Sequence, residues 1–131
     1  MKKIKIVQTK ENNTPYIPIK IEDKTVYVMI DTGASDSLID TEFFEALKNT
    51  YKLKDYVEVN TALDTSIIAP VYELPFLVND FLFFDDFTTC NLNLLNKLDA
   101  DFKPIVGILG SSFLYKYKAI IDFYNLNIKF I

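Results

Sequence analysis

The sequence contains no histidine, and this absence removes several classes of catalytic and metal site. Nucleophilic systems of the Ser-His and Cys-His types need an imidazole base, so this chain cannot build them. Cys90 is the only cysteine, which excludes an internal disulfide and a cysteine-rich zinc site, and we expect a buried thiol. Every cation is a lysine, so an arginine clamp on phosphate is excluded as well. Catalysis, where present, must rest on carboxylates or lysines.

Charge and hydropathy limit the classes of molecule and membrane with which the chain can associate. A net charge of -4 lacks the basic footprint of a nucleic-acid-binding protein. The basic start, Met1 to Val7, is followed by Lys10 and Glu11 before an apolar signal-peptide core can develop, so we expect an unprocessed, cytoplasmic protein. No apolar run approaches the length that spans a membrane. With 131 residues, half of them hydrophobic, residues 1–131 are expected to form a single domain.

Glycine is scarce, and its three positions fall in only two segments. Gly33 lies in Asp31-Thr32-Gly33-Ala34-Ser35, and Gly107 and Gly110 lie in the apolar segment 105–114. Glycine permits backbone conformations and close approaches that other residues resist. The first segment follows an apolar run over 25–30 that ends on the Asp31 carboxylate. Both segments are therefore expected to be turns that carry the function.

Alternating apolar residues and turn signals predict an all-β domain with a few short helices. Strands are predicted over 16–21, 25–30, 56–59, 71–78, 81–84, 119–123 and 128–131, and helices over 42–48, 92–98 and 113–117. Asp40 or Thr41 is expected to cap the first helix, and Ser111 the last. Asn79-Asp80 is expected to be a turn, and Phe81, Phe83, Phe84 and Phe87 to lie in the core. Asp85-Asp86 is expected to be a solvated loop.

A carboxylate at the end of a buried strand can take part in peptide hydrolysis if a second one lies beside it. One carboxylate then takes a proton from water while the other donates a proton to the carbonyl oxygen. Two such groups cannot both ionise at close range, so the pair keeps one proton over a useful pH range. Each aspartate must be held at a strand end by a tight turn, which Thr32-Gly33 can supply.

Asp31-Thr32-Gly33-Ala34, followed about eighty residues later by Ile108-Leu109-Gly110 and a predicted helix, resembles the retropepsin-like (retroviral-type) aspartic proteases. The tripeptide Asp-Thr-Gly alone is weak, because it recurs by chance in many turns. The apolar strand before it and the aliphatic-aliphatic-glycine segment after it make the combination specific. The resemblance covers roughly residues 17–130 and extends to free-standing bacterial or phage members.

The resemblance implies a closed all-β barrel with one or two short helices that forms one half of a two-fold homodimer. Asp31 would be the catalytic carboxylate, Thr32 would bind the backbone of the second chain, and Gly33 would let the substrate approach. Ile108, Leu109 and Gly110 would support the active-site turn. Because the chain has one such motif, two Asp31 carboxylates from two chains would activate a water and hydrolyse a peptide bond, with no metal or cofactor.

A protein or peptide substrate would bind to such a dimer in an extended conformation. The expected substrate contacts are Gly33, Ala34, Ser35 and Asp36 after the motif, and Ala62, Leu63, Asp64 and Thr65 at the tip of a covering hairpin, the flap. In viral members the flap tip is rich in glycine, whereas residues 61–68 contain none. The flap is therefore expected to be stiffer, or to turn at Asp64, since aspartate tolerates left-handed geometry better than most residues.

Other departures from the family pattern surround the motif. Ser35 stands where viral enzymes often have an acid, and Ser111-Ser112 stand where they have Arg-Asn, so hydroxyls replace the usual buried ion pair. Ala34 offers the carboxylate no hydroxyl, unlike the serine of pepsin-like enzymes. With one hydrogen bond fewer to the charged form, we expect a mildly acidic optimum, and a peak near about pH 2 would contradict this.

Several alternatives remain open at the level of sequence. Residues 3–7 and 128–131 are strand-like and can build a sheet shared between two chains, or 128–131 can pair with 119–123 in a hairpin. Asp31 can be a turn carboxylate, and Asp36 a substrate contact or a cap. A non-catalytic homodimer of the same fold that binds an extended peptide is the main alternative function, followed by a monomeric barrel.

Overall fold

A computed structural model describes residues 3–8, 14–60, 65–92 and 105–130. Its strands are β1 (Ile4–Lys5), β2 (Val7–Gln8), β3 (Pro15–Ile21), β4 (Lys24–Ile30), β5 (Ser37–Asp40), β6 (Leu53–Asn60), β7 (Ser66–Val78), β8 (Phe81–Cys90), β9 (Ile105–Leu109), β10 (Ile120–Asp122) and β11 (Asn127–Lys129). Its helices are α1 (Thr41–Glu45) and α3 (Ser111–Lys116). The prediction of an all-β fold with short helices is confirmed.

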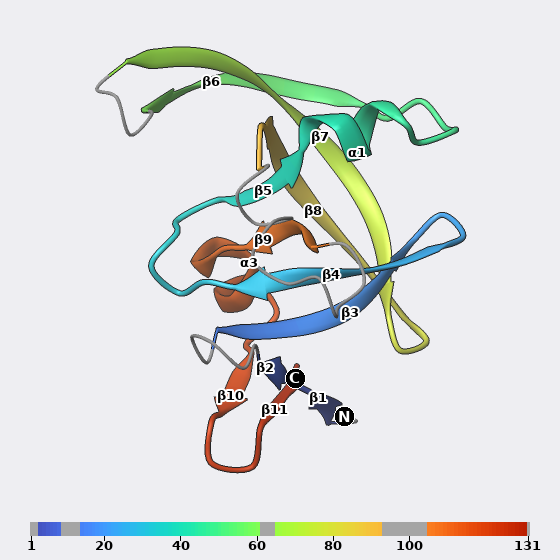
Figure 1. Cartoon of the computed structure of the whole chain (residues 1–131), viewed down its shortest axis with the longest axis vertical. Helices are drawn as coiled ribbons and strands as arrows, with labels where there is room; N and C mark the ends of the chain where they lie inside the picture. Colours follow the sequence, from blue (N-terminus) through green and yellow to red (C-terminus); the bar gives the residue numbers. More distant parts are fainter. Residues whose placement is uncertain (1–2, 9–13, 61–64, 93–104, 131) are drawn as a thin grey trace.

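Six strands close into a barrel. Hydrogen-bonded neighbours follow the order β3-β4-β9-β5-β8-β7, and a pairing of Lys20 in β3 with Leu77 in β7 closes the ring. β4 and β9 run parallel, as do β5 and β8, whereas the other neighbours in the ring are antiparallel. Figure 1 shows β3, β4 and β9 crossing the middle of the molecule, with α3 beside β9. Parallel neighbours end at the same edge of a sheet, so the last residues of β4 and β9 lie side by side.

The β3–β4 hairpin follows from the alternation seen in the sequence. Ile17, Ile19 and Ile21 point inward and are at most 1% exposed. The connection turns at Glu22, whose backbone lies in the left-handed region at φ 55°. β4 contributes Val28 to the same core. The predicted strands over 16–21 and 25–30 are thus confirmed with shifts of one residue.

β8 is longer than predicted and its side chains alternate in and out. Phe83 and Phe87 are 5% and 0% exposed, as expected for core residues. Phe81 and Phe84 are 40% and 44% exposed, so their predicted burial is wrong. Phe84 faces the side opposite to Phe83, because successive residues of a strand alternate, and Phe81 lies at the start of β8 beside the turn. Asp85 and Asp86 lie within the strand, so the predicted loop is wrong as well. Asp85 shares the inward side with Phe83 and Phe87.

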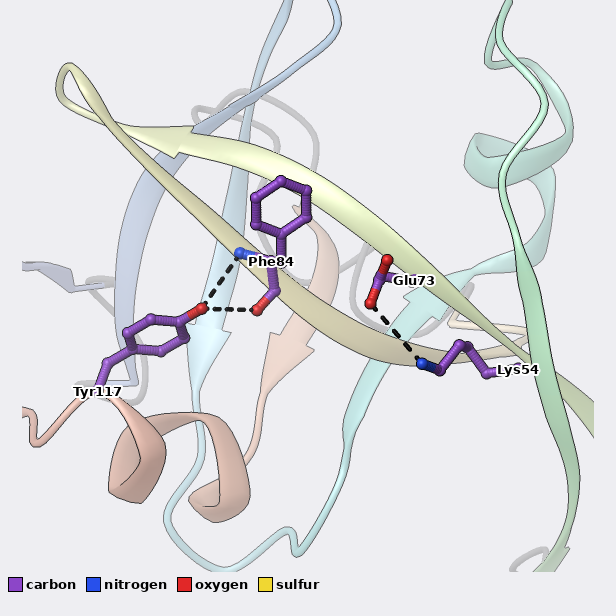
Figure 2. Close-up of polar contacts among 4 residues, drawn as sticks. All are labelled: Lys54, Glu73, Phe84 and Tyr117. Carbon is purple, nitrogen blue, oxygen red and sulfur yellow. Dashed lines mark hydrogen bonds and ion pairs between the residues drawn. The ribbon is translucent and has the colours of Figure 1, made fainter.

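A cluster of aromatic rings joins β7, β8 and α3. Phe76, Phe83 and Phe113 lie with their ring centroids 5.5 to 6.0 Å apart, and Phe130 lies 5.0 Å from Phe83. These separations suit offset and edge-to-face packing. Figure 2 shows how Tyr117, at the end of α3, adds a polar link: its hydroxyl accepts from the Phe84 N–H at 3.3 Å and donates to the Phe84 carbonyl at 3.0 Å. Apolar packing and hydrogen bonds therefore hold α3 against β8.

β6 and β7 form a long antiparallel hairpin in which Asn60 faces Ser66. This hairpin is the predicted flap, and Figure 1 shows it extending beyond the barrel at the top. An ion pair of 3.8 Å between Lys54 and Glu73 crosses it (Figure 2), and both side chains are exposed enough that its contribution to stability is small. Residues 61–64, including the predicted tip, lie outside the described residues, as does most of the predicted helix over 92–98.

Helix α1 is shorter than the predicted 42–48. The Asp40 side chain caps it by accepting from the Phe43 N–H at 3.2 Å, as one of the two predicted caps. The N–H groups of Lys48 and Asn49 donate to the Glu22 carboxylate at 2.9 and 3.0 Å instead of continuing the helix. A carboxylate distant in the sequence therefore holds the chain that follows α1.

The two ends of the chain meet in a small separate sheet with the order β1-β11-β10. Ile4 pairs with Ile128, and Ile121 pairs with Ile128 from the other side. The predicted hairpin between 119–123 and 128–131 thus forms, and the N-terminal strand joins it within the same chain. A sheet shared between two chains stays a prediction. Figure 1 shows this sheet below the barrel, with the outer edge of β10 facing away from β11. Among the described residues, no helix is long and apolar enough to cross a membrane.

Candidate active site

Asp31 is the first residue after β4, at the edge where β4 and β9 end together. Ile30 pairs with Leu109, and the Asp31 N–H donates to the Leu109 carbonyl at 3.1 Å. The parallel pairing therefore fixes the position of the Asp31 backbone, while its side chain remains partly exposed. Leu109 is fully buried, so the anchor of Asp31 belongs to the core.

The turn after Asp31 folds back on its carboxylate. The Gly33 N–H donates to Asp31 Oδ1 at 2.9 Å, and the Ala34 N–H donates to the Asp31 carbonyl at 3.2 Å. A Cβ atom on Gly33 would lie 3.3 Å from Asp31 Oδ1, a tight but not forbidden contact. Thr32 and Gly33 are exposed, so the carboxylate sits on an open turn that a substrate can reach.

The second glycine segment docks on this turn through backbone hydrogen bonds. Ser111 N–H donates to the Ala34 carbonyl at 2.7 Å, and Ser112 N–H donates to the Ser35 carbonyl at 3.1 Å. Ser111 is therefore the first residue of α3, and Gly110 is its N-cap without a side-chain hydrogen bond. The prediction that Ser111 caps the helix is wrong, because Gly110 occupies the N-cap position and Ser111 lies inside the helix.

Glycine is required at position 110 because a side chain would collide with neighbouring backbone atoms, and not because of an unusual backbone angle. Its φ is -87°, which any residue can adopt. A Cβ atom here would lie 2.6 Å from the Asp36 carbonyl carbon and oxygen and 2.9 Å from the Ala34 oxygen. Backbone cannot yield as a flexible side chain can, so only glycine allows this approach. Ile108 precedes it in β9 and pairs with Leu38 of β5. The predicted support residues Ile108, Leu109 and Gly110 thus lie together beside Asp31.

The residues predicted to contact substrate divide into two groups. Ala34 is partly buried, and Ser35 and Asp36 are exposed beside the turn. Asp36 lines a cavity of about 270 Å³ with Lys54 and Val57 of the flap hairpin and Asp86 of β8. Thr65, at the start of the returning flap strand, is exposed, while Ala62, Leu63 and Asp64 lie outside the described residues. The structure therefore brings Asp36, but not the flap tip, into a described cavity.

A second hollow on the other side of the turn was not anticipated from the sequence. Thr32 lines a cavity of about 460 Å³ with Leu114 and Tyr115 of α3 and Ala119 and Ile121 beyond it. Tyr115 is 87% exposed and the nearby Ile120 is 44% exposed. The sequence predicted a helix over 113–117 and a strand over 119–123 here, but neither was given a role at the site.

Asp85 is the second residue that sequence reasoning missed. Burial raises the pKa of Asp85 above its usual value of 3.8, although hydrogen bonding with Ser37 and with the Asp86 backbone acts to lower it. Oδ2 is buried and has no hydrogen-bond partner. The spacing Phe83, Asp85, Phe87 was the signal, because residues two apart on a strand share a side.

The described residues contain no group of three or more histidine, cysteine, aspartate or glutamate side chains that could hold a metal ion. Cys90 is partly buried, and burial, followed by the nearby Asp40 carboxylate, raises the pKa of its thiol. A raised pKa reduces the thiolate fraction, which makes this thiol a poor nucleophile. The chemistry available at this site is therefore that of the Asp31 carboxylate on its open turn.

Comparisons with known proteins agree with this geometry. A comparison with curated protein sequences finds no significant match. The fold is similar to that of a retropepsin-like aspartic protease from Rickettsia conorii, with a TM-score of 0.60 and 23% identity over 98% of this chain and 90% of that one. It is also similar to the EIAV protease in complex with the inhibitor HBY-793, with a TM-score of 0.63 and 16% identity over 88% and 99% of the two chains.

The retroviral protease-like domain of Ddi1 from Leishmania major gives a TM-score of 0.57 at 16% identity, over 90% of this chain and 94% of that domain. At these identities the likeness establishes the shared fold. A family model described as aspartyl protease matches residues 17–113, well over half of the chain, including both glycine segments. The protein is thus a member of the retropepsin-like aspartyl protease family.

Proposed function

We propose that the protein is an aspartic endopeptidase in which two Asp31 carboxylates, one from each chain of a homodimer, activate a water molecule. One Asp31 takes a proton from the water, and the other donates a proton to the carbonyl oxygen of the scissile peptide bond. The two groups share a single proton between them, which like charges at close range require. No group beyond the two carboxylates and the water is needed for these proton transfers.

The observation that carries the proposal is the way Asp31 is held. Its N–H is fixed by the Leu109 carbonyl, and its Oδ1 accepts from the Gly33 N–H at 2.9 Å. The Gly110 segment braces the turn from the other side through Ser111 and Ser112. A carboxylate that merely ended a strand would not need a second segment, distant in the sequence, packed at backbone contact. Rigid placement of a reacting group is what catalysis by proximity requires.

Support for the homodimer comes from the surface beside the turn. The chain has one Asp-Thr-Gly motif, so a second Asp31 must come from a second copy. Thr32 lies at the border of the apolar hollow formed with Leu114 and Tyr115 of α3. The outer edge of β10 has no strand partner among the described residues, and Ile120 on it is exposed. We propose that this face, from Thr32 to β10, meets the second copy around a two-fold axis.

The substrate would lie as an extended strand between the turn and the flap hairpin. Gly33, Ala34, Ser35 and Asp36 would contact it from below, and Ala62, Leu63, Asp64 and Thr65 from the flap. The cavity that Asp36 shares with β6 supports the lower part of this assignment. Main-chain hydrogen bonds would provide most of the affinity, and side-chain cavities the choice of sequence.

Cleavage of a broad peptide library between about pH 4 and pH 7 tests the proposal, with the wild type compared with Asp31→Asn. We expect activity in the wild type and a loss on the order of a thousandfold or more in the variant. The exposed Asp80, at the turn before β8, offers a matched control, and Asp80→Asn is expected to behave as the wild type. Specific activity should rise with protein concentration as the dimer forms.

Sizing by analytical ultracentrifugation in the same buffers separates the alternatives. An inert protein that is dimeric at the assay concentration would support the non-catalytic peptide-binding module instead. A protein that stays monomeric at high concentration would contradict the paired Asp31 mechanism outright.

A further inference from the structure

The strand β6 has few contacts that fix its position. It stands last in the order of the sheet, so β7 is its only strand neighbour among the described residues. Each side chain of β6 is exposed or half-buried, so packing in the core does not hold this strand. Figure 1 shows β6 and β7 extending together beyond the barrel. The position of β6 therefore depends on its pairing with β7 and on the chain that leads into it.

The chain that leads into β6 is held by the Glu22 carboxylate. The N–H groups of Lys48 and Asn49 donate to its two oxygens at 2.9 and 3.0 Å, and the Tyr51 hydroxyl donates to one of them at 2.7 Å. Hydrogen bonds to an ionised acceptor are stronger than those between neutral groups. Glu22 itself lies in the turn between β3 and β4, two neighbouring strands of the barrel. One carboxylate on the barrel thus ties down the start of the flap hairpin.

Aromatic packing extends the same link to β7. The ring centroid of Tyr51 lies 6.2 Å from that of Phe44 in α1, and Phe44 lies 4.5 Å from Tyr72 in β7. These separations are typical of favourable aromatic pairs. Tyr72 pairs with Leu53, the first residue of β6. The contacts that begin at Glu22 therefore reach both strands of the flap hairpin at the level where β6 starts.

β6 also forms one wall of the cavity beside the active-site turn. The cavity of about 270 Å³ is lined from β6 by Lys54, Asp55 and Val57, and from the turn by Asp36. Lys54 comes only three residues after Tyr51, whose hydroxyl is bound to the carboxylate. A shift at the start of β6 would therefore change the shape of this cavity.

The Asp31 carboxylate is held by other contacts. Its N–H donates to the Leu109 carbonyl at 3.1 Å, and its Oδ1 atom accepts from the Gly33 N–H at 2.9 Å. Neither contact involves β6 or Glu22. Loss of the link at Glu22 should therefore displace the wall of the cavity and leave the Asp31 carboxylate in place.

We propose that Glu22 is a positioning residue for the flap hairpin: its carboxylate fixes the start of β6 and thereby the wall of the substrate cavity that faces Asp36. The effect on peptide cleavage rests on the proposed function, whereas the link between Glu22 and β6 does not. Glu22 acts on the substrate only through β6, and its loss weakens substrate binding more than it slows the chemical step.

Hydrogen exchange of the intact protein tests the link without any substrate. Glu22→Gln leaves one acceptor oxygen in place of two, and we expect the amides of residues 53–60 to exchange on the order of tenfold faster than in the wild type. Asp23→Asn makes the same change of charge at the neighbouring exposed position and should exchange as the wild type does. Unchanged exchange of residues 53–60 in Glu22→Gln overturns the inference, whatever happens in the core strands.

Tyr51→Phe is the milder variant, and it decides the question if Glu22→Gln does not fold. It keeps the ring beside Phe44 and removes only the hydrogen bond of 2.7 Å to Glu22. We expect residues 53–60 to exchange about threefold faster than in the wild type. Exchange at the wild-type rate in a folded Tyr51→Phe protein would overturn the inference in that case.

Kinetics connect the link with the proposed peptidase activity. Glu22→Gln should raise KM about tenfold and change kcat by less than about twofold, because the cavity wall moves and Asp31 does not. A general loss of stability would instead reduce the active fraction and leave KM unchanged. A fall in kcat at unchanged KM would therefore overturn the positioning role. Faster exchange of β6 in a protein that cleaves no peptide would support the link and count against the proposed function alone.

Discussion

The backbone N–H of Ser111 donates a hydrogen bond of 2.7 Å to the carbonyl oxygen of Ala34. This contact joins the first residue of α3 to the turn that presents Asp31. Ser112 and Gly110 add further hydrogen bonds to Ser35 and Ser37. The backbone N–H groups at the start of α3 therefore donate to the carbonyl oxygens of the active-site turn. The geometry of the turn depends on the segment from Gly110 to Ser112.

Replacing Gly110 by alanine should disrupt this contact. The new Cβ atom would lie 2.6 Å from the backbone of Asp36, so the turn or β9 must move. We expect a destabilisation of about 1–3 kcal/mol and loss of any peptidase activity, measured by urea unfolding and peptide cleavage. Gly33→Ala is the matched comparison: its Cβ would lie 3.3 Å from Asp31 Oδ1, so stability should change much less. Equal destabilisation of both variants would contradict the spatial explanation.

Tyr117→Phe isolates the polar link between α3 and β8. The ring should keep its packing 4.8 Å from Phe83 and 4.9 Å from Phe113, while both hydrogen bonds to Phe84 are lost. We expect the free energy of unfolding to fall by about 1 kcal/mol, followed by thermal denaturation. Tyr124→Phe serves as the control, since Tyr124 is 94% exposed. An unchanged melting temperature in Tyr117→Phe would show that packing alone holds the helix.

Glu22 should make stability depend on pH. Hydrogen bonds from the Lys48 and Asn49 backbone, followed by one of 2.7 Å from the Tyr51 hydroxyl, lower the pKa of Glu22 below its usual 4.5. A lowered pKa in the folded state stabilises the fold above 4.5, and this stabilisation is lost as the pH falls through the folded-state pKa. Glu22→Gln should therefore be less stable than the wild type near neutral pH.

Chemical denaturation at neutral pH and below the lowered pKa of Glu22 measures this difference. The gap between Glu22→Gln and the wild type should close in acid, because Glu22 is then protonated in both the folded and the unfolded chain. Asp23→Asn, next to Glu22 and exposed, provides the control for a change of charge at the same hairpin. A gap that persists in acid would mean that the charge of Glu22 is not responsible.

The proposed subunit interface can be tested at the edge of β10. Ile120 is 44% exposed in the single chain, and a glutamate in its place would bring two negative charges together across a two-fold axis. We expect Ile120→Glu to raise the dimer dissociation constant about tenfold or more, measured by analytical ultracentrifugation. Leu82→Glu introduces the same charge at a 57% exposed position on β8, away from the proposed face. If both variants weaken association equally, the interface lies elsewhere.

The sequence predicted the Asp31 turn and the close approach of a glycine segment from local patterns, whereas the catalytic and binding roles given to these residues stay predictions. An apolar strand that ends in Asp-Thr-Gly, and a glycine segment that needs close approach, depend on residues that lie near one another in the chain. The prediction that Gly110 lies against the turn of Asp31 followed from family resemblance, and the structure supplies the reason in the missing Cβ atom. The β3–β4 hairpin was predicted from alternation in the same way.

Features set by distant residues were missed. The segment after α1 is held by the Glu22 carboxylate, and the helix sequence gives no sign of this distant partner. β8 was predicted to stop before Asp85 because two acids interrupt an apolar run, although alternation continues through them to Phe87. Ser37 attracted no attention, since a serine gives no sign that its hydroxyl will bind a backbone N–H 73 residues away.

The separation of Ser37 and Gly110 along the chain also determines when the Asp31 turn can form during protein synthesis. Gly110, which completes the turn of Asp31, is 73 residues beyond the serine that receives its hydrogen bond. Contacts between such distant segments form late, because a long loop must close before they give any stabilisation. A nascent chain released up to β8 would carry the Asp-Thr-Gly motif without the segment that braces it. The ribosome therefore finishes nearly the whole domain before the Asp31 turn is braced, so that the proposed peptidase activity could arise only after that point.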